Sequence, residues 1–150
     1  MTARQGAQPV GFLVDTNVVS ELRKGERADP GVRSWYDAAP AESLFLSALT
    51  IGELRRGILS IARRDPAQAA ILEAWLDRLL ATSADRIVPV DRRVALAWAP
   101  LMVPDPRPVI DALLAATAIV NDLALVTRNV ADFGGLGVTV VNPFSRASGH

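Results

Sequence analysis

Short apolar runs alternate with longer segments of helical periodicity along most of the chain. Residues 11–15 form the first apolar run, and residues 18–23 then have helical spacing. The order repeats in residues 43–47, an apolar run, and residues 48–64, where apolar side chains recur every three or four positions. Strands that alternate with helices indicate an α/β fold, with a mainly parallel central sheet flanked by helices on both faces.

Three further helices are marked by their first residues. Asp29 and Asp65 each precede a proline, and Asp91 follows a short apolar run. An aspartate can accept hydrogen bonds from the free amides at a helix start, and proline suits the first helical position because its missing N–H is not needed there. Behind Asp65, the apolar stripe over residues 71–80 is typical of a helix that faces the core. Any exposed part of it would suit a dimer contact or a partner helix.

The remaining elements lie in the second half of the chain. A β-branched run at residues 87–90 predicts one strand, and apolar runs at residues 123–127 and 138–141 predict two more. Residues 109–121 are apolar on nearly every side, which is typical of a helix packed between other elements.

Length and composition fit one globular domain. The chain has 150 residues, of which 50% are hydrophobic and 21% are charged, so it can bury a core and is too apolar to remain disordered. We expect one domain over residues 11–144, between flexible tails at residues 1–10 and 145–150. We see no signal peptide and no apolar segment long enough for a bilayer, so we expect a cytoplasmic protein with no membrane contact.

Carboxylates are the main candidates for acid–base or metal chemistry. The chain has no cysteine, and its single histidine, His150, is the last residue. Sixteen basic residues balance 16 acidic ones, so affinity for nucleic acid would need a local cluster of positive charge. One candidate cluster is a basic rim of Arg55, Arg56, Arg63 and Arg64, although each arginine taken singly fits a solvated helix face.

Two aspartates follow predicted strands. Asp15 ends the first apolar run, and Asp132 lies just beyond the run at residues 123–127. In open α/β sheets, the carboxyl ends of the strands meet in the crevice where ligands bind. Asp15 would also serve as a helix cap, but a charge that ends a central strand is costly without a partner. Asp132 taken alone fits an ordinary loop, and Asn129 competes for the same corner.

Two more acids lie near the beginnings of predicted helices. Glu53 fits a solvated helix position, but Gly52 beside it has poor helix propensity, which predicts the close approach of a ligand or another backbone. Asp111 is favoured by the helix dipole, yet a charge is unusual in a helix of small apolar residues. We favour a role in a site for both.

Four segments, in this order, resemble the PIN-domain toxins, and in particular their VapC and FitB-like subgroup. They are LVDTN at residues 13–17, TIGEL around Glu53, IDALLAATA from residue 110, and VTRN at residues 126–129 with Asp132 shortly after. The resemblance runs from about residue 12 to residue 144. It implies a PIN-like three-layer sandwich and a ribonuclease toxin of a type II toxin–antitoxin pair. Such a protein would cleave RNA with Mg²⁺ or Mn²⁺, form a homodimer and be inhibited by a cognate antitoxin.

The resemblance also implies roles for individual residues. The catalytic acids would be Asp15, Glu53, Asp111 and Asp132. Of these, Asp15 and Asp111 would bind the metal. The polar positions that orient acids, water or substrate are matched by Thr16, Asn17, Thr127 and Asn129. Arg128 would contact a phosphate.

Two positions depart from the subgroup. A Gly-Arg-Pro-Leu-Pro type segment usually precedes the third acid, whereas residues 103–108 read Val-Pro-Asp-Pro-Arg-Pro here, so we expect a different loop above the site. Position 129 is Asn where many relatives outside the subgroup have Asp, which leaves open whether Asn129 or Asp132 completes the acidic site.

The expected chemistry fits these residue types. Carboxylates that lie close together repel one another, and some take up protons near neutral pH unless a cation compensates them. Mg²⁺ prefers oxygen ligands and commonly needs only one or two direct carboxylates, with the others acting through water. Such an ion lowers the pKa of bound water and offsets the charge of a phosphate, as hydrolysis of an RNA backbone requires.

The same residues bear on two other functions. A haloacid-type phosphatase also begins with an aspartate at a strand end, but it needs a second aspartate two residues later, where this chain has Asn17. A non-catalytic module that binds protein or RNA without cutting it remains the main alternative, and an RNase assay with magnesium or EDTA separates it from the nuclease.

Overall fold

The structure, a computed structural model, describes residues 8–145 and is built on a five-stranded parallel sheet. The strand order is β3-β2-β1-β4-β5, so β1 lies at the centre, between β2 and β4. The strands are β1 (Gly11–Val14), β2 (Leu44–Ser47), β3 (Ile87–Val88), β4 (Leu123–Val126) and β5 (Val140–Val141). All pairings between neighbours are parallel, so the carboxyl ends of all five strands lie at one edge of the sheet.

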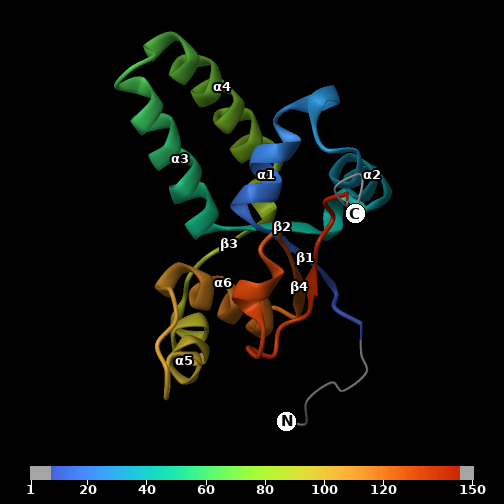
Figure 1. Ribbon diagram of the computed structural model, residues 1–150, viewed down its shortest axis with the longest axis vertical. Coiled ribbons are helices and arrows are strands. Elements are labelled where there is room, and N and C mark those ends of the chain that lie inside the picture. The colour runs from blue at the N-terminus through green and yellow to red at the C-terminus, as the bar shows by residue number, and fades with distance from the viewer. Residues whose placement is uncertain (1–7, 146–150) are drawn as a thin grey trace.

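Helices cover both faces of this sheet (Figure 1). The upper layer in that view contains α1 (Thr16–Leu22), α2 (Pro30–Ala38), α3 (Ala48–Ala62) and α4 (Pro66–Thr82). The lower layer contains α5 (Arg92–Leu101) and α6 (Val109–Val120). Short 3-10 turns lie at Gly25–Arg27, Ala41–Ser43, Ala84–Arg86 and Val130–Phe133. The predicted three-layer α/β sandwich is confirmed, and its sheet is parallel throughout.

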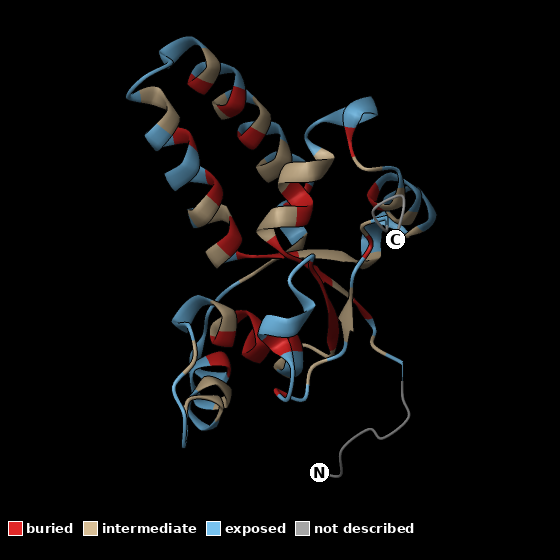
Figure 2. Cartoon of the chain, viewed as in Figure 1, coloured by how far each residue is buried: buried red, intermediate tan, exposed pale blue. Residues whose placement is uncertain are grey.

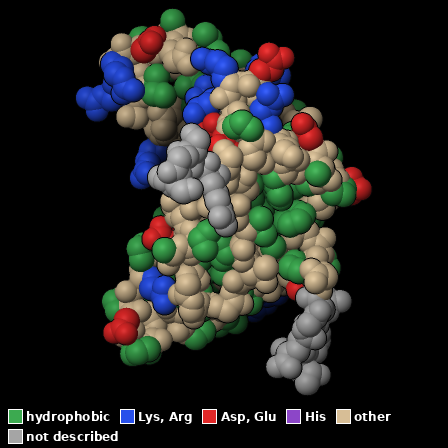
Figure 3. All heavy atoms as spheres, turned by 45° about the vertical axis from the view of Figure 1, so that its right-hand side comes forward, with side chains coloured by type: hydrophobic (Ala, Val, Ile, Leu, Met, Phe, Trp, Pro, Cys, Tyr) green, Lys and Arg blue, Asp and Glu red, His purple; other side chains and the backbone are tan. Residues whose placement is uncertain are grey.

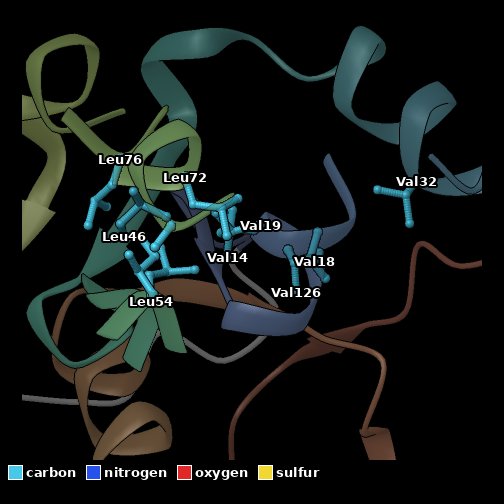
Figure 4. Close-up of a cluster of buried hydrophobic side chains, with 11 residues drawn as sticks. Val14, Val18, Val19, Val32, Leu46, Leu54, Leu72, Leu76 and Val126 are labelled. Atoms are coloured by element: carbon cyan, nitrogen blue, oxygen red, sulfur yellow. The ribbon is translucent and has the colours of Figure 1, made fainter. Parts of the chain in front are cut away.

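Each face of the sheet has its own apolar core, and Figure 2 shows the buried residues concentrated where helices meet the sheet. Successive strand residues point to opposite faces, so Val14 packs in the upper core and Leu13 in the lower one. Figure 4 shows the upper cluster, in which Leu72 and Leu76 of α4 contact the sheet side chains. Full burial of such a side chain contributes about 1.5–3 kcal/mol.

The predicted helix starts are confirmed at the level of single hydrogen bonds. The carboxylates of Asp29, Asp65 and Asp91 each accept a hydrogen bond from the backbone amide three residues later, over 3.0, 3.1 and 3.0 Å. Pro30 and Pro66 occupy the first helical positions, as expected. These caps fix where α2, α4 and α5 begin.

Some element ends differ from the prediction. Strand β3 stops at Val88 rather than residue 90, because Pro89 has no N–H to donate to a neighbouring strand. Strand β5 begins at Val140 rather than residue 138, since Gly137 still has a positive φ of 78° and the chain is turning there. Helix α1 begins at Thr16, two residues earlier than expected, because Asp15 caps it.

The predicted tails fall largely on residues 1–7 and 146–150, which lie outside the described residues. Of the residues that are described, Val10 donates its backbone amide to the carbonyl oxygen of Asp122 over 2.9 Å, and Ser145 contacts Asp29. Within residues 8–145, no helix is long and apolar enough to cross a membrane.

Candidate active site

The carboxyl ends of β1 and β4 place Asp15 beside Thr127. Asp15 follows β1, is only 7% exposed, and accepts a hydrogen bond on Oδ1 from the backbone amide of Thr16 over 2.7 Å. Its Oδ2 accepts from the hydroxyl of Thr127 over 2.8 Å and from the side-chain amide of Asn17 over 3.3 Å. Asp15 therefore caps α1 and also belongs to a polar network, so the two interpretations drawn from the sequence do not compete.

The polar residues after β4 continue this network. The side-chain amide of Asn17 also donates to the hydroxyl of Thr127 over 3.2 Å, and the same hydroxyl accepts from the backbone amide of Asn129 over 3.1 Å. The backbone amide of Arg128 donates to Oδ1 of Asn17 over 3.1 Å. Residues more than 100 positions apart are thereby held in one fixed arrangement around the Asp15 carboxylate.

Glu53 is joined to the same network through Thr16. The Thr16 hydroxyl donates to Oε1 of Glu53 over 2.7 Å, which links the start of α1 to the first turns of α3. The expected close approach of another backbone at Gly52 is wrong for the described chain: a Cβ added there would meet no atom within 4 Å. Gly52 instead lines a hollow of about 370 Å³ that Glu53 and Ile110 also line.

Asp111, in the first turn of α6, lies within electrostatic reach of the other acids. Its pKa is raised, first by burial and then by the negative charges of Asp132, Asp15 and Glu53. Asp132 lies in the Val130–Phe133 turn that follows β4, and its charge acts on Asp111 more strongly than the charges of the other two. The structure thus gathers all four predicted acids around one region at the carboxyl edge of the sheet.

The site concentrates negative charge without a basic partner. Burial raises the pKa of Asp15 first, the hydrogen bonds from Thr127, Thr16 and Asn17 oppose that rise, and the charge of Glu53 adds to it. Among residues 8–145, none of the four acids forms an ion pair with lysine or arginine. Nor do the described residues hold three acids already positioned as ligands of one ion. Mg²⁺ commonly needs only one or two direct carboxylates, with water as its other ligands, so the absence of a three-acid ligand set among these residues does not argue against a cation.

Asn129 and Asp132 occupy different positions relative to this cluster. The backbone amide of Asn129 donates to the hydroxyl of Thr127, whereas the negative charge of Asp132 raises the pKa of Asp111. Asp132 is therefore the better placed of the two to act as an acid next to Asp111.

One residue near the site was not predicted from the sequence. The guanidinium of Arg128 lies over the ring of Phe144, 4.5 Å from the ring centroid. Phe144 follows the last strand by three residues, and its apolar character there was the only sequence signal. An aromatic residue shortly after a final strand is common, so this contact could be recognised only in three dimensions.

Comparison with known proteins places this geometry in a family. The PIN domain family matches residues 12–133. VapC ribonuclease Y4jK of Sinorhizobium fredii is 35% identical over 142 residues, which cover 91% of this chain and 99% of that protein. Toxin FitB of Neisseria gonorrhoeae is 31% identical over 138 residues, covering 89% and 98% of the two chains.

Solved structures give the same result. The structure of FitAB bound to an IR36 DNA fragment superposes with a TM-score of 0.80 and 28% identity, and the match covers 93% of this chain and 99% of that one. Because the family match spans most of the chain and these relatives align over nearly their whole length, this chain is a member of the PIN domain family, in the group that contains VapC and FitB.

Proposed function

We propose that this protein is a metal-dependent ribonuclease that acts as the toxin of a type II toxin–antitoxin pair. The observation that carries the proposal is the gathering of Asp15, Glu53, Asp111 and Asp132, from four separate parts of the chain, around one unneutralised region. An acidic cluster that serves only the fold is costly, because like charges destabilise it. The names of the relatives, a VapC ribonuclease and a toxin, support the same activity.

The residues of the cluster fit Mg²⁺ or Mn²⁺. They offer only carboxylate and neutral oxygen donors, which hard divalent ions prefer. Burial first, and then the charges of neighbouring acids, raise the pKa values of Asp15 and Asp111, and a bound cation would offset both effects. Asp15 and Asp111 would hold the ion. When bound, the ion would activate water and offset charge on the scissile phosphate.

The residues of the chain have separable tasks in this proposal. Thr127 and Asn17 hold the Asp15 carboxylate in one orientation by donating to its Oδ2. Thr16 holds Glu53 in the same way through Oε1. Glu53 and Asp132 then accept hydrogen bonds from the water molecules of the site, and Arg128, exposed beside the network, contacts an RNA phosphate.

Cleavage of RNA by the purified protein tests the proposal directly. Wild type and Asp15→Asn are compared on total RNA in Mg²⁺, in Mn²⁺ and in EDTA, and the ends of the products are sequenced. We expect wild type to cleave only with the metals and Asp15→Asn to be inactive while keeping a wild-type circular dichroism spectrum. Undiminished metal-dependent cleavage by Asp15→Asn would refute the assignment of the site. Absence of cleavage by wild type would favour a non-catalytic binding module.

Basic side chains suited to RNA lie on the half of the molecule that carries the upper helices. On the face seen in Figure 3, Lys and Arg gather mainly in this half. Arg56, Arg63 and Arg64 of the candidate rim are exposed, whereas Arg55 pairs with Glu73 of α4. The rim is thus a local source of positive charge in a chain whose net charge is zero.

An antitoxin would find a hollow of about 460 Å³ between α1, α2, β2 and α4, whose lining is mainly apolar but also includes Arg23, Arg33 and Arg86. In α4, Leu72 and Leu76 face the core, Ile71 is 63% exposed, and the half-buried Trp75 and Leu79 line this hollow. The other apolar lining comes mainly from Val19, Leu22, Tyr36 and Leu46. The stripe over residues 71–80 was expected to face the core, and it is partly exposed. Its exposed part forms one wall of a groove suited to an apolar segment of a partner.

The proposal also includes a homodimer of a single PIN domain over residues 11–144, acting in the cytoplasm. Apolar side chains are exposed on the lower layer, among them Leu96 at 70%, Val103 at 73% and Val109 at 52%. Exposed apolar side chains of this size are common in protein–protein contacts, and a dimer interface on this layer would cover them. Molecular mass in solution, measured by light scattering, tests the dimer.

A further inference from the structure

The guanidinium of Arg128 is held by an aromatic ring rather than by a carboxylate. Its central carbon lies 4.5 Å from the centroid of the Phe144 ring. The backbone of Arg128 is tied to Asn17, which also donates to Asp15. The arginine is therefore fixed at both ends, at its backbone by the acidic site and at its charged group by Phe144.

The ring is itself fixed by the last described residues of the chain. The backbone amide of Phe144 donates to Oδ1 of Asn142 over 3.0 Å, and that of Ser145 donates to Oδ2 of Asp29 over 2.9 Å. The segment passes so close to α2 that a Cβ at Gly31 would lie 2.5 Å from the carbonyl oxygen of Pro143. Phe144 also packs against the upper apolar core, so the position of the ring is restrained.

A cation that rests on a ring keeps its charge and its N–H donors. Arg55 and Arg86 are each paired with a carboxylate, which partly neutralises them. Arg128 forms no ion pair with the described residues, and it is exposed. A guanidinium over an aromatic ring still has N–H donors to offer, and its planar fork suits two-point contact with a phosphate.

We propose that Phe144 is a positioning residue, which holds the guanidinium of Arg128 where it binds an RNA phosphate beside the acidic site. The inference rests on the proposed ribonuclease function for its substrate. An unsupported arginine loses rotamer freedom when it binds a ligand, whereas the ring has already restrained this one. Phe144 thus acts on substrate affinity through Arg128, without touching the reacting atoms.

Replacement of the ring tests the proposal. Phe144→Leu keeps an apolar side chain but removes the ring, and Phe144→Tyr keeps the ring. We expect Phe144→Leu to raise KM for an RNA substrate about two- to fivefold, the range of an exposed cation–π contact, while kcat stays unchanged and Phe144→Tyr restores the wild-type KM. We expect Arg128→Ala to raise KM about tenfold or more, since a charged hydrogen bond is lost.

The salt dependence and a double variant separate positioning from general destabilisation. Loss of one phosphate contact lowers the slope of log affinity against log salt by about 0.7 for a single strand. We expect that change in Arg128→Ala but not in Arg92→Ala, an exposed arginine at the start of α5. In the Arg128→Ala background, Phe144→Leu should have no further effect on KM. An equal effect in both backgrounds, or a wild-type KM in Phe144→Leu, overturns the proposal.

A measurement of RNA binding in EDTA tests the positioning role of Phe144 independently of the proposed ribonuclease function. Fluorescence anisotropy with a labelled RNA oligonucleotide measures affinity without cleavage. If wild type binds with the expected dependence on Arg128 and Phe144 but does not cleave with metal, only the proposed ribonuclease function fails. If neither Arg128→Ala nor Phe144→Leu weakens binding, the positioning role of Phe144 is refuted even where wild type cleaves.

Discussion

The hydroxyl of Thr127 lies 2.8 Å from Oδ2 of Asp15 and joins the carboxyl ends of two neighbouring central strands. Both residues are buried, Thr127 completely, so water cannot replace this hydrogen bond without a change in packing. The same hydroxyl accepts from Asn17 and Asn129. One oxygen atom therefore sets the orientation of an acid and of two amides.

Thr127→Val removes this oxygen at nearly constant volume. The pKa of Asp15 should rise further above its ordinary value, because the strongest hydrogen bond that opposes the effect of burial is lost. We expect cleavage to fall at least tenfold at neutral pH. Thr127→Ser keeps the hydroxyl and should retain most of the activity. Equal loss in the two variants would show that packing around residue 127, and not its hydrogen bond, is what matters.

Divalent metal should stabilise the protein through the acidic cluster. An ion that binds only the folded state contributes about 2.7 kcal/mol at 100 times its Kd, which corresponds to a rise of several degrees in Tm for a chain of this length. Differential scanning calorimetry with Mg²⁺ or Mn²⁺ measures the rise. We expect it to be much smaller for Asp111→Asn and unchanged for Asp77→Asn, a control on the exposed side of α4.

Without metal, Asp111→Asn should no longer lower Tm relative to wild type. Burial and the charges of Asp132, Asp15 and Glu53 raise the pKa of Asp111, so the ionised side chain destabilises the fold at neutral pH. Its neutral replacement should leave Tm in EDTA equal to that of wild type or higher. A clear fall in Tm would mean that Asp111 has a structural partner in the folded chain.

Local signals in the sequence predicted most of the fold. Asp29, Asp65 and Asp91 are caps whose partners lie three residues away, so a short stretch of sequence contains the whole interaction. The strand ends were less certain: the last residue of β3 and the first residue of β5 differ from the prediction, and both strands pair with neighbours distant in sequence. The four acids were singled out because each lies after a strand or in the first turns of a helix.

Interactions between distant residues could not be read from the sequence. Thr16 and Glu53 are separated by 37 positions and Ser145 and Asp29 by 116, and nothing in either local pattern indicates the other partner. The empty space beside Gly52 is a similar case: the low helix propensity of glycine was recognised, but a nearby backbone was the wrong explanation. Such details depend on how helices pack, which periodicity does not specify.

Asp29→Ala should weaken the attachment of the C-terminal segment as well as helix α2. The Asp29 carboxylate accepts from the amide of Val32 and from the amide and hydroxyl of Ser145. Loss of an aspartate cap costs about 1 kcal/mol, and we expect at least this fall in the free energy of unfolding at pH 7, measured with urea. Asp37→Ala, an exposed aspartate on the same helix, should change it little.

The stabilisation by the Asp29 carboxylate should decrease at acid pH. Burial raises the pKa of Asp29, but the hydrogen bonds from Ser145, Val32 and Gly31 more than offset it, and the pKa lies below its ordinary value. The stabilisation is therefore present above the ordinary pKa and is lost as the pH falls through the lowered one. The difference in the free energy of unfolding between wild type and Asp29→Ala should therefore decrease as the pH falls through this range. A constant difference would mean that the ionised state of Asp29 does not contribute.

Removal of an aromatic side chain from the hollow should separate antitoxin binding from the fold. Tyr36 lines the hollow and is 46% exposed in the free chain, so Tyr36→Ala leaves the buried core intact. Loss of an aromatic contact at the centre of an interface costs about 2 kcal/mol or more, which exceeds a factor of ten in Kd. Calorimetric titration with the cognate antitoxin should show this loss, whereas Ser34→Ala, exposed on the same helix but outside the hollow, should bind normally. Wild-type affinity in Tyr36→Ala would place the antitoxin on another surface.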